Sequence, residues 1–529
     1  MKKVFFQILA LVILSACSHK EEGNVDKPNI ILIYADDLGA GLLSHEGQQI
    51  IKTPHIDRLA EEGIRFQNAY SAMLCAPARA SLITGLHDCH AERFEITSAG
   101  IYEKISTGAS SQQEIESMIN SALSPVANDR VFLGEVAQKA GYTTAQVGKL
   151  EWGFAATHQQ MKRHGWDYYL GYLDHVRAHG FYPPFLFENG QLIEIEGNTL
   201  SNCGKSGEPE TEAVLKERWD MTGKKVYSQT MFMDTVLGFI EENKDKPFFL
   251  YFPTQLPHGP VSVPVVHPDF AEDQRLSQIE KEYASMVKML DEHVGQIMQK
   301  LKTLGLDDNT IVIFTSDNGH EIYYSQKGRI HKPYTNMQTG EVFDNLENKY
   351  YSDLGGDVFD GNKGRAGLKR SNLQGGIEVP LIVRWPERIR PGRVSKRLVA
   401  NYDLLPTIAG ITGFSGPLQT DGISFLPELN GETSVESGHD FVVYASFLGP
   451  TLITREGWKI RTYLHKNIFE LYYLPEDYRE EKNLAEKYPE RLEELKSKLI
   501  SACDGDLTNG LYSSKNLLNV EQKPPLQGH

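Results

Sequence analysis

The chain has 529 residues, a formal net charge of −16 and five cysteines. This length allows a large buried core and predicts one major domain with a smaller one beside it. The acidic balance and the lack of a long basic run argue against nucleic acid as a partner, and the cysteines imply no disulfide framework.

The N-terminal residues predict export from the cytoplasm. Two lysines precede an apolar run at residues 4–14, which is too short to span a bilayer, and Cys17 follows directly after Leu-Ser-Ala. This order resembles a bacterial lipoprotein signal, in which residues 1–16 are removed, Cys17 carries the lipid and residues 17–27 form a polar tether. The resemblance implies the cell envelope of a Gram-negative bacterium, with the membrane contacted only through the anchor. The alternative is a plain secretory signal with an incidental cysteine.

Short apolar runs alternate with helical stretches through residues 28–415, which we expect to form the major domain. Alternating strands and helices predict an α/β fold, with a mostly parallel sheet covered by helices on both faces. Ligands in such folds gather at the carboxyl ends of the strands. Residues 416–529 are expected to form a smaller C-terminal α+β subdomain. The predicted buried strands are residues 29–34, 143–147, 247–252, 310–315 and 380–385, and the clearest helices are residues 56–63 and 280–304.

Acidic residues follow two of these predicted strands. Asp36 and Asp37 come just after the first strand, and Asp317 and Asn318 come just after residues 310–315. Three carboxylates and an amide oxygen form a hard set of ligands that suits calcium or magnesium and offers little to zinc. The alternative is turn chemistry, because Asp and Asn often end strands for conformational reasons.

The sequence from Cys75 to Gly85 is the most informative stretch of the chain. It reads Cys-Ala-Pro-Ala-Arg-Ala-Ser-Leu-Ile-Thr-Gly, so that Pro77 suits the first turn of a helix and Gly85 suits its C-terminal end. Cys75 then lies at the positive end of a short helix, where an anion is stabilised. The alternative is an ordinary buried thiol on a helix.

This stretch resembles the signature of type I sulfatases, members of the alkaline phosphatase superfamily. In that family a formylglycine-generating maturation enzyme oxidises the cysteine of Cys-x-Pro-x-Arg. The resemblance implies one calcium ion held by Asp36, Asp37, Asp317 and Asn318, with the formylglycine oxygen of Cys75 completing the shell. It also implies the sulfatase fold and the hydrolysis of sulfate esters. Within the family, the chain resembles the carbohydrate sulfatases of Bacteroidota.

Two lysines and one histidine match further family motifs. Lys149 closes the strand at residues 143–147, Lys369 lies in Gly-Leu-Lys-Arg, and His258 lies in Leu-Pro-His-Gly-Pro. By resemblance, Arg79, Lys149 and Lys369 stabilise an anionic sulfuryl group, and His258 donates a proton to the leaving group. The alternatives are solvated lysines and a histidine packed in a turn.

One position departs from the family pattern. Many members read Gly-Lys-x-His where this chain has Gly-Lys-Leu-Glu, so Glu151 stands in place of a histidine. We expect Glu151 to serve as a base if burial raises its pKa. The same departure keeps an inactive glycan-binding lipoprotein open as an alternative. A phosphatase or phosphonate hydrolase of the same superfamily is the other alternative, although Cys75 in its full motif speaks against it.

The substrate is expected to be a sulfated carbohydrate, with sulfated galactose or N-acetylgalactosamine as a guess. Residues 174–183 are dense in aromatic and charged side chains and supply the candidates His175, Arg177 and His179. Arg365 ends a long predicted loop at residues 320–365 and is a fourth candidate. The alternative for each of them is a structural or solvated loop residue.

Overall fold

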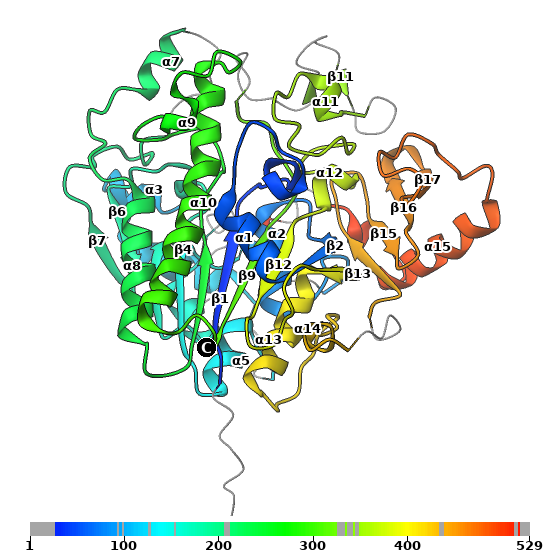
Figure 1. The fold of residues 1–529 in the computed structure, drawn as a ribbon, viewed down its shortest axis with the longest axis horizontal. Coiled ribbons are helices and arrows are strands. Elements are labelled where there is room, and N and C mark those ends of the chain that lie inside the picture. The colour runs from blue at the N-terminus through cyan, green and yellow to red at the C-terminus, as the bar shows by residue number, and fades with distance from the viewer. Residues whose placement is uncertain are drawn as a thin grey trace, which may run out of the picture.

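A ten-stranded sheet forms the centre of the computed structural model (Figure 1). Its strand order is β13-β2-β12-β9-β1-β8-β4-β5-β6-β7, and β1 lies between β9 and β8 and is parallel to both. The strands are β1 (Asn29–Ala35), β2 (Ile64–Tyr70), β4 (Thr143–Lys149), β5 (Tyr168–Tyr172), β6 (Phe185–Glu188), β7 (Gln191–Glu194), β8 (Phe248–Pro253), β9 (Thr310–Ser316), β12 (Leu381–Arg384) and β13 (Arg393–Ala400).

The structure describes residues 27–518, except 93–94, 98–99, 125–128, 153–154, 206–211, 325–333, 336–341, 344–348, 433–437 and 513–516. The expected lipoprotein signal, Cys17 and nearly all of the tether therefore lie outside the described residues, as does much of the predicted loop at residues 320–365. No helix of the described part is both long and apolar enough to cross a membrane.

All five predicted strands are present, each within two residues of its expected ends. Four of them are mutually parallel, as expected. The fifth, β12, runs antiparallel to both β9 and β2. β6 and β7 add two further antiparallel strands at the far edge. The sheet is therefore mixed and mostly parallel, which confirms the expected fold class.

Two hydrophobic cores lie on opposite faces of the sheet. Along β1, Ile31 and Ile33 belong to one core, whereas Ile30 and Leu32 belong to the other, because neighbouring strand residues point to opposite faces. The first core includes α1 (Pro54–Glu62), α8 (Ser228–Glu242) and α10 (Gln278–Leu304), and the second includes α2 (Cys75–Thr84), α5 (Leu133–Lys139) and α13 (Leu404–Thr412). Both predicted helices, now α1 and α10, are confirmed.

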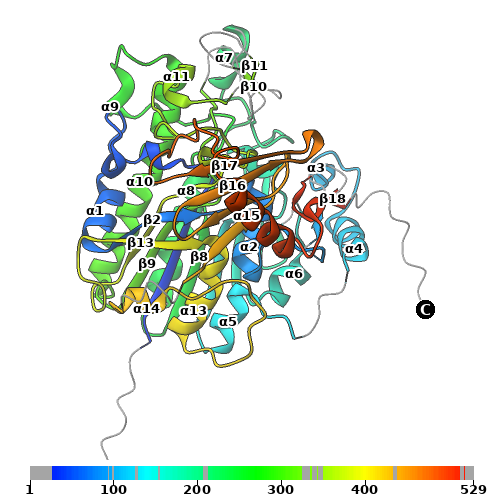
Figure 2. The same ribbon diagram turned by 90° about the vertical axis from the view of Figure 1, so that its right-hand side faces the viewer.

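A smaller antiparallel sheet covers one side of the catalytic region (Figure 2). Its core also includes Cys75 and Ala78 of α2, so this sheet supports the helix that carries the cysteine. The smaller C-terminal α+β region is thus confirmed, while a division between residues 415 and 416 remains a prediction. The sheet contains β14 (Phe441–Tyr444), β15 (Thr451–Thr454), β16 (Trp458–Tyr463) and β17 (Ile468–Tyr473), and α15 (Pro489–Ala502) packs against it.

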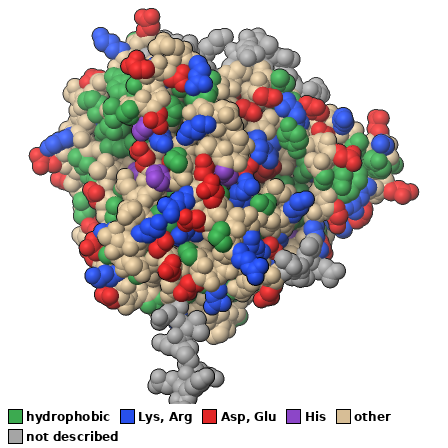
Figure 3. Space-filling view, viewed as in Figure 1, with side chains coloured by type: hydrophobic (Ala, Val, Ile, Leu, Met, Phe, Trp, Pro, Cys, Tyr) green, Lys and Arg blue, Asp and Glu red, His purple; other side chains and the backbone are tan. Residues whose placement is uncertain are grey.

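The remaining elements are short connections around these two sheets. Acidic and basic side chains are interspersed over the face of the molecule seen in Figure 3. The other helices are α3 (Glu103–Ser106), α4 (Gln112–Ala122), α6 (His158–Arg163), α7 (Glu212–Arg218), α9 (Pro268–Ala271), α11 (Ser352–Gly355), α12 (Gln374–Ile377) and α14 (Leu426–Leu429). The other strands are β3 (Ile96–Thr97), β10 (Tyr334–Thr335), β11 (Val342–Phe343) and β18 (Leu517–Leu518).

Candidate active site

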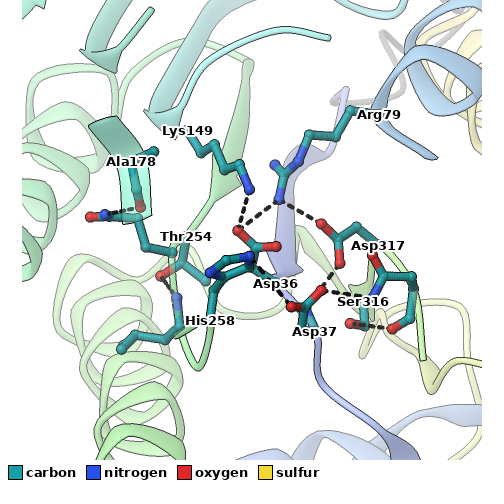
Figure 4. Close-up of polar contacts among 12 residues, drawn as sticks. Asp36, Asp37, Arg79, Lys149, Ala178, Thr254, His258, Ser316 and Asp317 are labelled. Atoms are coloured by element: carbon teal, nitrogen blue, oxygen red, sulfur yellow. Dashed lines mark hydrogen bonds and ion pairs between the residues drawn. The ribbon is translucent and has the colours of Figure 1, made fainter. Parts of the chain in front are cut away.

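The predicted acidic residues meet at the carboxyl edge of the central strands (Figure 4). Asp36 and Asp37 follow β1, and Asp317 and Asn318 follow its parallel neighbour β9. The backbone N–H of Asp37 donates to Oδ1 of Asp317 at 3.0 Å, and Nδ2 of Asn318 donates to Oδ1 of Asp37 at 2.7 Å. All four side chains are fully buried. Sequence reasoning therefore found the residues of this cluster.

Each predicted cation pairs with one of these carboxylates. Lys149 Nζ lies 2.7 Å from Oδ2 of Asp36, and Lys369 Nζ lies 2.7 Å from Oδ1 of Asp37. Arg79 Nη2 lies 2.9 Å from Oδ2 of Asp317. The three cations come from β4, from the loop before α12 and from α2, so three separate parts of the chain converge here.

The buried charges shift the pKa values of the carboxyl groups in opposite directions. Burial is the largest single effect and raises the pKa of each Asp. At Asp36 the charges of Lys149, His258 and Arg79 together outweigh burial, so its pKa lies below the ordinary range. At Asp37 the charge and hydrogen bond of Lys369, with the hydrogen bonds of Tyr323 and Asn318, lower the pKa in the same way. At Asp317, burial and the nearby Asp36 raise the pKa to about 8 despite Arg79. Asp317 therefore holds its proton more tightly than the other two carboxyl groups of the cluster.

The donor set fits a hard divalent cation. Oδ1 of Asp36 and Oδ1 of Asn318 are buried and have no hydrogen-bond partner, although buried polar atoms are normally satisfied. Asp36, Cys75 and Asp317 each offer a ligand atom, and these atoms lie within 4.8 Å of one another. Carboxylate and amide oxygens are the ligands that calcium or magnesium prefers. The expected metal-binding groups are thus in place.

Cys75 begins α2 beside this cluster. The helix runs from Cys75 to Thr84 and ends at Gly85, whose φ of 72° is the left-handed conformation expected of a C-terminal glycine. Cys75 is buried, and its charge would act on both Arg79 and Lys369. Nε and Nη1 of Arg79 are buried without hydrogen-bond partners, so donors for an anion remain available next to Cys75.

His258 faces the same cluster through one ring nitrogen. Its Nδ1 donates to the carbonyl of Gly259 at 2.5 Å, and its Nε2 lies 3.4 Å from both Oδ2 of Asp37 and Nζ of Lys369. The carbonyl partner fixes the proton on Nδ1, so only Nε2 can exchange a proton at the cluster. The role of His258 as a proton donor remains a prediction.

Two of the candidate substrate residues lie close to the cluster. His175 is buried, and its pKa lies well below the ordinary value because of burial and then the charges of Lys149 and Arg79. The ring of His179 stacks on His258 with centroids 4.1 Å apart. Their roles in binding substrate remain predictions.

Three other candidates make their contacts elsewhere in the described part of the chain. The carboxylate of Glu151 accepts from Nε1 of Trp166 at 2.5 Å and lies 2.6 Å from Nδ1 of His164. Arg177 donates to the carbonyl of Phe185 at 2.9 Å and stacks on the Phe185 ring. Arg365 forms an ion pair with Glu378 and lines a crevice beside the smaller sheet. The structure does not bring these three side chains into contact with the aspartates, and their roles remain predictions.

Sequence reasoning missed two residues that contact the cluster. The hydroxyl of Tyr323 donates to Oδ2 of Asp37, and its ring lies against His258. Ser71 Oγ donates to the backbone carbonyl of Asp317. The only available signal was position, because Tyr323 follows Asp317 by six residues and Ser71 directly follows β2.

Comparisons with known proteins agree with this geometry. The sulfatase family model matches residues 28–414, and the model of the C-terminal region of N-sulphoglucosamine sulphohydrolase matches residues 367–504. An N-acetylgalactosamine-6-O-sulfatase of Bacteroides thetaiotaomicron is 28% identical, over 93% of this chain and 97% of the relative. The N-acetylgalactosamine-6-sulfatase of Rattus norvegicus is 29% identical, over 80% of this chain and 70% of the relative.

The fold also matches a solved structure. A sulfatase structure from a study of how Bacteroides thetaiotaomicron metabolises multiple glycosaminoglycans has a TM-score of 0.67 and 24% identity, and it covers 90% of this chain and all of that one. Because the family model covers well over half of the residues, the chain belongs to the sulfatase family and is a sulfuric ester hydrolase.

Proposed function

We propose that the chain hydrolyses sulfate esters on carbohydrates, with 6-O-sulfated N-acetylgalactosamine as its substrate. The observation that carries this proposal is the convergence of Cys75, Arg79, Lys149 and Lys369 on the buried aspartates. The sugar and the sulfate position rest on the relatives, because the bacterial and the rat relative are both named for N-acetylgalactosamine-6-sulfate.

Two groups complete the site in this proposal. A calcium ion held by Asp36, Asp37, Asp317 and Asn318 would polarise the bound sulfate ester. Formylglycine, made from Cys75 by a maturation enzyme, would supply the nucleophilic hydroxyl. The two unpartnered buried oxygens of Asp36 and Asn318 support this ligand set.

The protein's own side chains would bind the sulfuryl group and move the proton. The free Nε and Nη1 of Arg79 donate to sulfuryl oxygens, and Lys149 and Lys369 add positive charge that is preorganised before substrate arrives. A sugar alcohol is a poor leaving group, so it needs a proton as the bond to sulfur breaks. Protonated His258 delivers that proton from Nε2, since its Nδ1 is held by Gly259.

We propose further that the enzyme is a lipoprotein of the Gram-negative cell envelope, anchored through Cys17. The lysines, short apolar run and Leu-Ser-Ala-Cys order of the N-terminus support this location. An envelope enzyme would meet extracellular glycans, which suits a carbohydrate sulfatase. Labelling of the wild-type chain, and not of Cys17→Ser, by an alkyne fatty acid would test the anchor.

Release of inorganic sulfate from a panel of sugar sulfates tests the proposed activity. The matured protein should act on N-acetylgalactosamine 6-sulfate, and Cys75→Ala should fold normally but release no sulfate. Preference for 4-sulfated sugars would contradict the proposed position. Binding without turnover by the wild-type protein would favour the inactive glycan-binding alternative, and phosphate release from phosphomonoesters in place of sulfate would favour the phosphatase alternative.

A further inference from the structure

The ring of His258 contacts two other rings. His179 stacks on it with centroids 4.1 Å apart and an interplanar angle of 17°, and Tyr323 lies 5.1 Å away at 40°. Only 4% of His258 is exposed. These two ring contacts and the burial of the side chain restrict rotation of the imidazole, which would otherwise carry Nε2 away from the cluster.

A buried glutamine ties the two loops that carry His179 and His258. Nε2 of Gln255 donates to the carbonyls of Ala178 at 2.5 Å and Gly180 at 3.0 Å, which flank His179 (Figure 4 labels Ala178). The backbone N–H of His258 donates to the carbonyl of Gln255 at 2.8 Å. The side-chain oxygen of Gln255 accepts from Ser228 and Gln229 of α8, so the link is fixed to the scaffold. The stack is therefore held in place from both loops.

His179 is suited to lie against a group that carries positive charge. Burial, followed by the charges of His258 and Lys149, lowers its pKa well below the ordinary value, so its ring stays neutral. A neutral ring covers one face of His258 without repelling the imidazolium form. The hydroxyl of Tyr323 donates to Asp37 and holds that carboxylate near Nε2 of His258.

We propose that His179 is a positioning residue for the leaving-group acid, and that its ring holds His258 so that Nε2 faces the departing oxygen. This inference rests on the proposed function and replaces a direct sugar contact as the role of His179. Its specific consequence concerns the leaving group. Misplacing the acid should slow substrates whose alcohol needs a proton and spare substrates whose leaving group departs as a stable anion.

Two variants and two substrates test the proposal. His179→Ala removes the stacked ring, and His179→Phe keeps an aromatic face without ring nitrogens. For the sugar sulfate, His179→Ala should lower kcat by at least about tenfold at unchanged KM, which is part of the roughly hundredfold to ten-thousandfold that a general acid supplies. For 4-nitrophenyl sulfate, kcat should stay within about twofold, and His179→Phe should recover most of the sugar-sulfate activity. Thermal unfolding of both variants establishes that they are folded.

Each other outcome has a definite meaning. Equal losses on both substrates would overturn the proposal, because general damage to the site does not depend on the leaving group. A raised KM for the sugar with unchanged kcat, or failure of His179→Phe to recover activity, would overturn it in favour of a direct sugar contact. A wild-type protein that releases sulfate from neither substrate would instead refute the proposed function, and the inference would fail with it.

Discussion

The charged side chains of the active site are buried in ion pairs, so each charge is stabilised by its partner. Lys149 pairs with Asp36, and Lys369 pairs with Asp37. Both pairs are buried, and the distance between nitrogen and oxygen in each leaves no room for a water molecule. Removing one member of a buried pair typically costs about 3 to 5 kcal/mol, because the other charge is left uncompensated. Substitutions at these positions therefore change stability as well as activity, and Cys75 is the cleaner site for a loss-of-function variant.

Glu151→Gln tests the departure from the family pattern. The contacts of Glu151 with His164 and Trp166 predict a loss of about 1 to 3 kcal/mol of stability, the usual effect of weakening hydrogen bonds to a buried charge. Turnover at saturating substrate should change little. Chemical unfolding and steady-state kinetics on the same preparation measure both quantities. A large loss of turnover with unchanged stability would instead support a role for Glu151 as a base.

Sequence patterns identified those site residues that lie directly at the end of a predicted strand. Asp36, Asp317 and Lys149 each lie at the end of a buried strand, so the parallel sheet alone brings them together. The patterns did not reveal that Glu151 turns towards His164 and Trp166. That direction depends on the packing of residues 13 and 15 positions further along, which no local motif records.

Helix α2 carries Cys75 at its N-terminal end, and its C-terminal end is fixed by contacts of Gly85. Gly85 adopts φ 72°, and its carbonyl accepts from the backbone N–H groups of Asp421 and Gly422. A Cβ at Gly85 would lie 2.4 Å from Oγ1 of Thr420. By contrast, Gly413 ends α13 with φ 74°, and a Cβ there would meet nothing within 4 Å. The two glycines share a conformation but differ in their surroundings.

Gly85→Ala should therefore destabilise the protein more than Gly413→Ala. The left-handed backbone costs each alanine roughly 1 kcal/mol, and the contact with Thr420 adds to that cost only at position 85. Guanidinium unfolding of the two variants and the wild-type protein measures the difference. Equal losses of stability would show that Thr420 moves away freely and that the end of α2 is not closely packed.

At the level of elements, the buried central strands could be predicted and the outer strands could not. β1 and β9 are buried throughout and read as continuous apolar runs. β2 mixes buried positions with exposed ones such as Gln67, and β13 does the same, so neither shows a clear apolar run. The sequence of β12, a strand of four residues, also gives no indication that the strand runs antiparallel.

At the scale of the whole molecule, we expect calcium to link activity with stability. If the proposed ion binds only the folded state, an ion at one hundred times its Kd stabilises the protein by about 2.7 kcal/mol. Chelation should then lower the melting temperature and the rate of sulfate release together, and added calcium should restore both. Elemental analysis should find one calcium per chain. Finding zinc, or two metals per chain, would contradict this account and favour the phosphatase alternative.

The catalytic region and the C-terminal region are joined by a titratable contact at His90. Nε2 of His90 lies 3.0 Å from Asp421, and Nδ1 lies 3.2 Å from Asp504, the residue that follows α15 closely. The hydrogen bond with Asp421, against the opposing effect of burial, raises the pKa of His90 to about 9. His87, stacked on His90, has its pKa lowered to about 4 by burial and stays neutral over the same range.

This contact should make stability depend on pH in one direction. Because the folded pKa lies above the ordinary 6.5, its contribution is complete below about pH 6.5 and is lost as the pH rises through about 9. The melting temperature of the wild-type protein should fall over that interval by more than that of His90→Gln. The groups are partly exposed, so the difference should be modest and should shrink in high salt. Parallel pH curves for the two proteins would exclude the contact as the cause.

The central claim, a sulfatase that acts through a modified Cys75, is tested most directly by mass spectrometry of the peptide that contains this residue. The peptide should be measured in protein of known specific activity, produced with and without a formylglycine-generating enzyme. The account predicts an aldehyde in place of the thiol, and a rate of sulfate release proportional to the modified fraction. Full activity in protein whose Cys75 remains entirely a thiol would contradict it.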